Sequence, residues 1–183
     1  MHVITTQREL ETFCDAVSGG DYLAVDTEFI RDRTYFPRLC LLQIAGKDQA
    51  AIIDPLAEGI DLAPVMALMQ NPKIVKVFHA ARQDIEIFYN LSRRIPAPIF
   101  DTQVAAAVCG FGESASYESL VNKIVGAEID KSSRFTDWAA RPLSDKQLAY
   151  ALSDVTHLCV IYETLLKKVG DASRLTWIEE EHV

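Results

Sequence analysis

Residues 23–30 read LAVDTEFI, a run of apolar side chains interrupted by two carboxylates, Asp26 and Glu28. Side chains alternate between the two faces of a β-strand, so residues two apart point to the same side. Two like charges on a largely buried strand repel each other, and burying either one unpaired is costly. The stretch is either an edge strand with a solvated acidic face or a cation site. The apolar segments on both sides of it favour the cation site.

The available ligands indicate which metal such a site would hold. Carboxylate oxygens are hard ligands and suit Mg²⁺ or Mn²⁺. The sequence contains no CxxC pair, and its four cysteines stand apart in apolar surroundings, so a zinc site is not predicted. Isolated cysteines of this kind are typical of a reduced, cytoplasmic setting.

The pattern around the acidic stretch predicts a mixed α/β sheet with helices on its faces. Residues 22–29, 39–46 and 50–55 are strand-like and joined by short connections, which indicates an antiparallel meander. Residues 73–80 form a fourth predicted strand, after which the chain becomes mainly helical. The predicted helices are one begun by the capping box Thr6-Gln-Arg-Glu9, 61–70, 81–91, one capped by Asp101, 117–126, and a long helix from Ser144 to about Val169.

A divalent cation needs further acidic ligands, and Asp84 is one candidate. It lies one turn into a helix that follows a predicted strand, in VFHAARQD, and α/β sheets commonly place sites at such strand ends. The alternative is a helix N-terminal acid that complements the helix dipole, worth about 0.3–1 kcal/mol. Asp54 and Asp101 are interpreted as structural, at a strand end and a helix cap.

A second candidate is the pair Tyr150 and Asp154 in the long predicted helix. They are four residues apart and therefore lie on one face. We expect that face to be turned well away from the apolar stripe, which leaves a surface Tyr–Asp pair as the alternative. The stripe consists of Leu148, Leu152, Val155, Cys159, Tyr162 and Leu166.

Length and composition suit one globular domain over residues 1–183, with 49% apolar and 24% charged residues. The sequence predicts no transmembrane helix and no signal peptide. The formal net charge of −8 argues against a broad surface that coats nucleic acid. It leaves room for a small site whose negative charge is offset by bound cations.

The order of the acidic motifs resembles that of the DEDDy branch of the DEDD superfamily of 3′→5′ exonucleases. The motifs are D-x-E at 26–28, then Asp84, then Tyr-x-x-x-Asp at 150–154. Four stretches of the sequence are similar to the exonuclease domain of the ribonuclease D family. They are VDTEFIRDRTYFPRLCLLQIA, VFHAARQDIEIF, FDTQVAA and DKSSRFTDWAARPLSDKQLAYALSDVTHL. This resemblance covers about residues 20–170. It implies an RNase H-like fold with a five-stranded mixed sheet, in which parallel strands extend three antiparallel ones and helices cover both faces.

The resemblance also implies the chemistry of the site. Two divalent cations, Mg²⁺ or Mn²⁺, would be held by Asp26, Glu28, Asp84 and Asp154. Such a pair of cations stabilises both the entering and the leaving oxygen of a phosphodiester. Tyr150 would orient the attacking water, because a phenol with a pKa near 10 is a poor free base at neutral pH.

The implied reaction removes nucleoside 5′-monophosphates from the 3′ ends of single-stranded RNA, with tRNA precursors as the substrate class. Phe29 would pack near the terminal nucleotide, and ring stacking with basic contacts commonly holds single strands. The connection that carries Arg31, Arg33 and Arg38 is either solvated charge or a contact for phosphates. The further candidates for substrate contact are Arg38, Gln43, His79 and Lys131.

Three other interpretations compete with this one: a DNA-directed 3′→5′ exonuclease, a non-catalytic nucleic-acid-binding module, and an acidic α/β interaction domain. The complete set of acids with Tyr150 argues against the binding module, and an interaction domain does not explain two carboxylates that point the same way from a buried strand. The resembled family carries helical HRDC domains after its exonuclease domain, and we expect this chain to lack them because it ends at Val183. Neither a protein partner nor a membrane is inferred.

Overall fold

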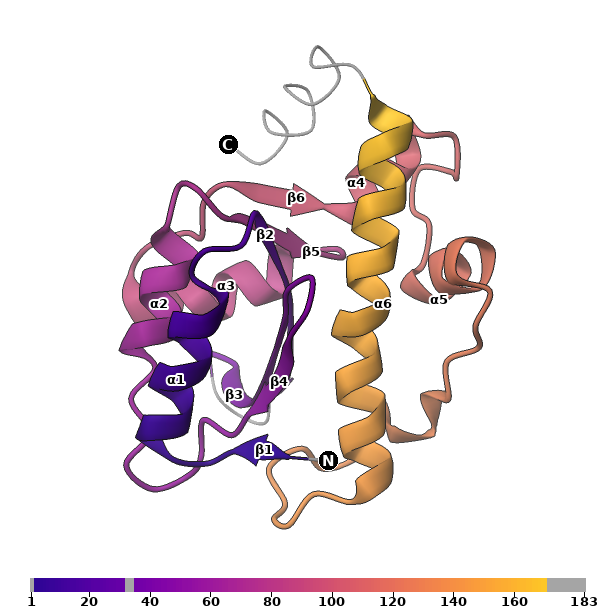
Figure 1. Cartoon of the computed structure of the whole chain (residues 1–183). Helices are drawn as coiled ribbons and strands as arrows, with labels where there is room; N and C mark the ends of the chain where they lie inside the picture. Colours follow the sequence, from indigo (N-terminus) through magenta and orange to yellow (C-terminus); the bar gives the residue numbers. More distant parts are fainter. Residues whose placement is uncertain (1, 32–34, 171–183) are drawn as a thin grey trace.

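The computed structural model describes residues 2–31 and 35–170, and these form a mixed sheet with helices on both faces (Figure 1). The strands are β1 (Val3–Ile4), β2 (Tyr22–Ile30), β3 (Arg38–Ala45), β4 (Ala50–Ile53), β5 (Val75–Phe78) and β6 (Ile99–Asp101). Their order across the sheet is β1-β4-β3-β2-β5-β6. Strands β2, β3 and β4 pair antiparallel, whereas β1, β5 and β6 join in parallel. The predicted fold class is therefore confirmed.

The sheet has six strands among the described residues, one more than predicted. The two-residue strand β1 pairs with β4 at one edge, and the three-residue strand β6 pairs with β5 at the other. Segments this short contain too few residues to show an alternating pattern, so their place in the sheet comes from pairing alone.

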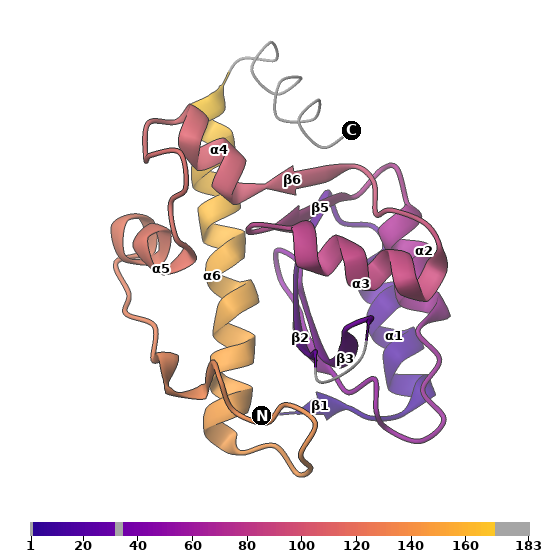
Figure 2. The same cartoon turned by 180° about the vertical axis from the view of Figure 1, so that it is seen from behind.

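Two helical layers enclose the sheet. The helices are α1 (Gln7–Val17), α2 (Ala63–Gln70), α3 (Arg82–Ser92), α4 (Thr102–Val108), α5 (Tyr117–Leu120) and α6 (Asp145–Val169). Alternation along β2 divides its side chains between the layers. Leu23 and Val25 pack with α1, α2 and α3, and Tyr22 and Ala24 pack with α4 and α6. Figure 2 shows the same division from behind.

Local signals set the ends of the main helices as predicted. Thr6 and Glu9 form a capping box at the start of α1, and Ser144 and Gln147 form another at the start of α6. Helix α6 ends at Gly170, which has a positive φ of 43°. The predicted helix 117–126 is irregular instead: α5 is followed by a π-helical turn over Val121–Val125. Among the described residues, no helix is both long and apolar enough to cross a membrane.

The apolar stripe predicted for α6 packs against the core, but the expectation that the face of Tyr150 and Asp154 turns well away from it is wrong. The helix buries Ala151, Asp154 and Leu158, whereas Leu152 of the predicted stripe is only partly buried. The reason is that α6 lies between two partners, the sheet on one side and the α4–α5 segment on the other. Its buried arc is therefore wider than a single stripe and includes Asp154, which the sequence pattern placed toward solvent.

Candidate active site

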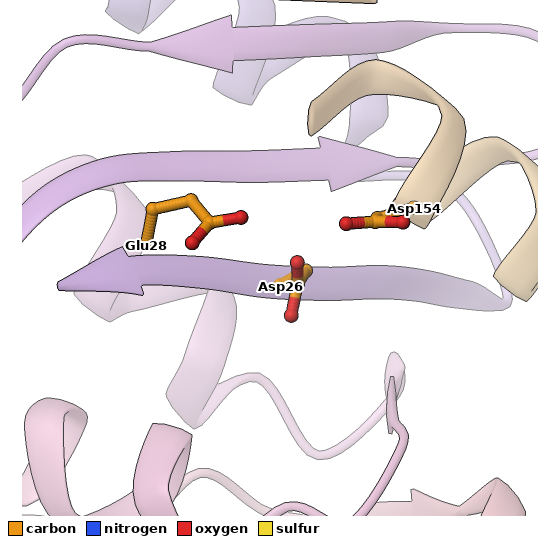
Figure 3. A group of neighbouring side chains, drawn as sticks. All are labelled: Asp26, Glu28 and Asp154. Atoms are coloured by element: carbon orange, nitrogen blue, oxygen red, sulfur yellow. The ribbon is translucent and has the colours of Figure 1, made fainter. Parts of the chain in front are cut away.

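Three carboxylates from β2 and α6 converge at the centre of the sheet (Figure 3). Asp26, Glu28 and Asp154 each place one carboxylate oxygen so that the three atoms lie within 4.8 Å of one another. The shared face of Asp26 and Glu28 follows from the alternation of β2, as predicted. Asp154 reaches them because α6 runs across that face of the sheet.

Asp84 lies in the same pocket but outside this group of three. It sits in the first turn of α3 and is buried. Its Oδ1 accepts a hydrogen bond of 2.6 Å from the Thr27 hydroxyl. Because Thr27 lies between Asp26 and Glu28 on β2, this bond ties α3 to the strand that carries the other two acids.

The four carboxyl groups perturb one another strongly. Burial raises the pKa of each above its ordinary value. Repulsion by Asp26 raises the pKa values of Glu28, Asp84 and Asp154 further, while the positive charge of Arg134 lowers those of Glu28 and Asp154. The cluster therefore retains protons near neutral pH, and a bound cation must displace them.

The donor set fits a hard divalent cation. All the converging ligands are carboxylate oxygens, which is the ligand type that Mg²⁺ and Mn²⁺ prefer. Asp154 Oδ1 is buried, and within the described part of the chain no hydrogen-bond donor reaches it. A buried carboxylate oxygen without a partner is costly, so this atom is suited to coordinating a cation.

Two tyrosines adjoin Asp154. Tyr150 lines the pocket one helical turn before it, and its hydroxyl lowers the pKa of Asp154 by hydrogen bonding. Burial and then the charge of Asp154 raise the pKa of Tyr150, so its phenol is protonated at neutral pH. Tyr117 of α5 also lines the pocket, and its hydroxyl donates to the backbone carbonyl of Asp154. The sequence offered no signal for Tyr117.

The acids open into a pocket of about 730 Å³, which contains three of the five predicted substrate contacts. Phe29, His79 and Lys131 line it. His79 Nδ1 lies 2.9 Å from the Thr102 hydroxyl, and burial lowers the pKa of the ring, which keeps it neutral. The Lys131 ammonium pairs with Glu118.

Arg38 and Gln43 do not line this pocket. The burial of Gln43 corrects its prediction as a substrate contact, whereas a contact by Arg38 stays a prediction. Arg38 is exposed at the start of β3. Gln43 lies opposite Asp26 in the β2–β3 pairing and is 0% exposed, so the sheet and α6 cover it. In the same basic connection, Arg31 pairs with Glu86 at 2.7 Å, and Arg33 lies outside the described residues.

One wall of the pocket comes from the segment before α6. Arg134, Phe135, Thr136 and Trp138 of this segment line the pocket. The Trp138 and Tyr150 rings lie 6.0 Å apart between centroids. These residues have no periodic pattern in the sequence, so only their position beside α6 identifies them as part of the site.

Comparisons with known proteins show the family and the fold of this chain. The model of a family described as 3′-5′ exonuclease matches residues 1–170. A protein named ribonuclease D from Jannaschia sp. (strain CCS1) is 55% identical over 184 residues, which cover 98% of this chain and 48% of that protein. The chain thus spans about half the length of the curated relatives it matches.

Solved structures give the same result for the fold. The structure of Escherichia coli RNase D, described as an exoribonuclease involved in structured RNA processing, superposes with a TM-score of 0.93 at 39% identity. The match covers 98% of this chain and 48% of that one. Brucella melitensis NrnC with bound Mg²⁺ superposes with a TM-score of 0.77 at 27% identity, over 89% of this chain and 80% of that one.

Proposed function

This chain belongs to the 3′-5′ exonuclease family, and we propose that it hydrolyses single-stranded RNA from the 3′ end in a reaction that depends on two divalent cations. The observation that carries the proposal is the convergence of Asp26, Glu28 and Asp154 within 4.8 Å at the base of a pocket. A phosphodiester is anionic, so carboxylates can serve its hydrolysis only when cations stand between them and the phosphate.

The proposed ligands divide into two groups. Asp26, Glu28 and Asp154 hold one cation, since their oxygens already converge. Asp84, in the same pocket, assists with a second cation next to Asp26. When bound, such cations supply charge neutralisation and a more acidic water. The bound Mg²⁺ of the Brucella NrnC structure supports Mg²⁺ as the physiological ion.

Tyr150 is assigned to orienting the attacking water. Its hydroxyl is protonated and lies beside Asp154, so it can donate a hydrogen bond without acting as a free base. The Tyr117 hydroxyl holds the backbone of Asp154 from the other side. Together the two contacts restrain the helical turn that supplies both Tyr150 and Asp154, and a restrained turn keeps the reacting groups aligned.

The 3′-terminal nucleotide is proposed to enter the pocket beside Phe29 and His79. Hydrolysis there releases a nucleoside 5′-monophosphate and leaves a new 3′ hydroxyl on the shortened strand. The names of the matched proteins, ribonuclease D and an exoribonuclease involved in structured RNA processing, support RNA as the substrate. Within RNA, tRNA precursors are the class that we propose from the family resemblance.

Asp26→Asn and Asp154→Asn test the proposal, with Asp48→Asn, an exposed acid outside the pocket, as the matched control. We expect the first two to abolish Mg²⁺-dependent hydrolysis of a labelled RNA single strand while the far-ultraviolet circular dichroism is unchanged. The control should hydrolyse like wild type. A matched DNA strand measures the preference for RNA. Full activity in purified Asp26→Asn would refute the assignment of the site.

A further inference from the structure

Phe135 is an exposed aromatic side chain at the wall of the pocket. It is 90% exposed, yet it belongs to the pocket lining, as does Arg134 beside it. The guanidinium carbon of Arg134 lies 5.3 Å from the centroid of the Phe135 ring. A ring and a cation presented together at the opening of a pocket are the two contacts that commonly hold a single nucleic-acid strand.

The backbone on both sides of this pair is held in place. Arg134 donates from its amide to the carbonyl of Lys131 at 3.0 Å. The Thr136 hydroxyl donates to the Ser133 carbonyl at 2.7 Å and accepts from Gln147 Nε2 at 3.0 Å, which ties the segment to the first turn of α6. The ring is therefore presented from a fixed backbone, which reduces the entropy lost when a base stacks on it.

The two positively charged side chains that line the pocket differ in whether they form an ion pair. Two cations line the pocket, and Lys131 is paired with Glu118. Arg134 forms no ion pair within the described part of the chain. Its positive charge lowers the pKa values of Glu28 and Asp154, which line the same pocket, and its own side chain is exposed. Arg134 can therefore take a phosphate without first breaking a salt bridge.

We propose that Arg134 and Phe135 form a second nucleotide subsite, in which a base upstream of the 3′-terminal nucleotide stacks on Phe135 and an adjacent phosphate contacts Arg134. This proposal rests on the proposed function, since it requires a strand whose 3′ end lies at the acids. Phe29 is partly buried beside Glu28, whereas Phe135 is almost fully exposed. The terminal base is therefore nearer Phe29, and Phe135 meets a base farther up the strand.

Stacking of this kind predicts a defined loss on truncation. Removing one aromatic platform weakens single-strand binding by roughly 5- to 150-fold, with little dependence on base identity. We expect Phe135→Ala to raise the Kd and the KM for an oligouridylate dodecamer by an amount in this range. The fold-change in KM should be larger for the dodecamer than for the same strand with abasic nucleotides at every upstream position, which offers Phe135 no base.

The experiment measures binding and hydrolysis separately. Binding of labelled dodecamer is followed by fluorescence anisotropy in the Asp26→Asn background, where the strand is not cut. Phe135→Trp should retain binding, and Phe135→Leu should lose it, because leucine keeps an apolar side chain but offers no ring. Tyr35→Ala is the matched control, since Tyr35 is 87% exposed and does not line the pocket.

Abasic substitution locates the contact along the strand. In the protein that retains Phe135, an abasic nucleotide at one upstream position should weaken binding as much as Phe135→Ala does. Combining the abasic strand with Phe135→Ala should weaken binding little more than either change alone. If Phe135→Ala binds the dodecamer as tightly as the parent protein with Phe135 does, the subsite is overturned, even if the wild-type enzyme hydrolyses RNA fully. Weakened binding by Phe135→Ala in a protein that cuts no RNA would leave the subsite standing and overturn only the proposed function.

Discussion

Arg141 and Asp54 form a two-point ion pair beneath the active-site wall. Arg141 Nε lies 2.8 Å from Asp54 Oδ2, and Nη2 lies 2.8 Å from Oδ1. The same guanidinium donates to the backbone carbonyls of Cys40, at 2.7 Å, and Trp138, also at 2.7 Å. One side chain therefore joins β3, the end of β4 and the segment that carries Arg134 and Phe135.

We expect Arg141→Gln to lower the free energy of unfolding by about 3 kcal/mol, because it removes the ion pair with the buried Asp54 and the hydrogen bonds to three backbone carbonyls in a partly buried place. Arg31→Gln is the control, since its pair with Glu86 is more exposed and worth less than about 1 kcal/mol. Urea denaturation measures both values. Equal losses in the two variants would contradict the anchoring role of Arg141.

Tyr150→Phe should lower kcat by about 100-fold and leave cation binding intact, because only the hydroxyl that orients water is removed. Tyr22→Phe is the matched control, since its hydroxyl donates to Glu163 at 2.8 Å away from the pocket. Single-turnover hydrolysis and Mn²⁺ titration separate the two effects. A Tyr150→Phe rate equal to wild type would remove the orienting role.

The metal-free protein should lose stability as the pH rises from about 4 to about 8. The pKa values of Asp84 and Asp154 are raised in the fold from 3.8 to about 8, by burial first and then by Asp26. The folded state therefore keeps protons that the unfolded chain has already released, and stability falls as these protons are lost. Bound Mg²⁺ should reverse the trend, because it replaces the protons.

Thermal unfolding across this pH range, in EDTA and in Mg²⁺, measures the effect. Asp26→Asn should show a shallower decline in EDTA, since it removes the charge that raises the pKa values of the other acids. A midpoint that rises with pH in EDTA would be inconsistent with a repulsive cluster.

Gln43 and Gln147 are both buried glutamines, with different surroundings. Within the described chain, neither polar side-chain atom of Gln43 has a hydrogen-bond partner. Gln147 accepts from the Ser144 amide at 2.9 Å and donates to the Thr136 hydroxyl at 3.0 Å. We expect Gln43→Met to raise the free energy of unfolding by up to about 1 kcal/mol, and Gln147→Met to lower it by about 1–2 kcal/mol. Chemical denaturation of both variants in EDTA compares them, and a large loss for Gln43→Met would show that its amide has a structural partner.

Much of the framework could be read from short stretches of the sequence. The alternation in LAVDTEFI predicts both the strand β2 and the shared face of Asp26 and Glu28. The capping boxes at Thr6 and Ser144 predict where α1 and α6 begin. These features depend on interactions between residues a few positions apart, so the residues that determine them are visible together in the sequence.

The tertiary structure decided which distant residues contact these strands and helices. It turned Asp154 toward β2, which the family resemblance implied but the helical pattern alone did not, because α6 packs between the sheet and the α4–α5 segment. It placed Arg134 and Phe135 at the pocket, buried Gln43 beneath α6, and left Arg38 outside. Burial and the meeting of distant charges depend on contacts between segments far apart in the chain, and neither helical nor strand periodicity records those contacts.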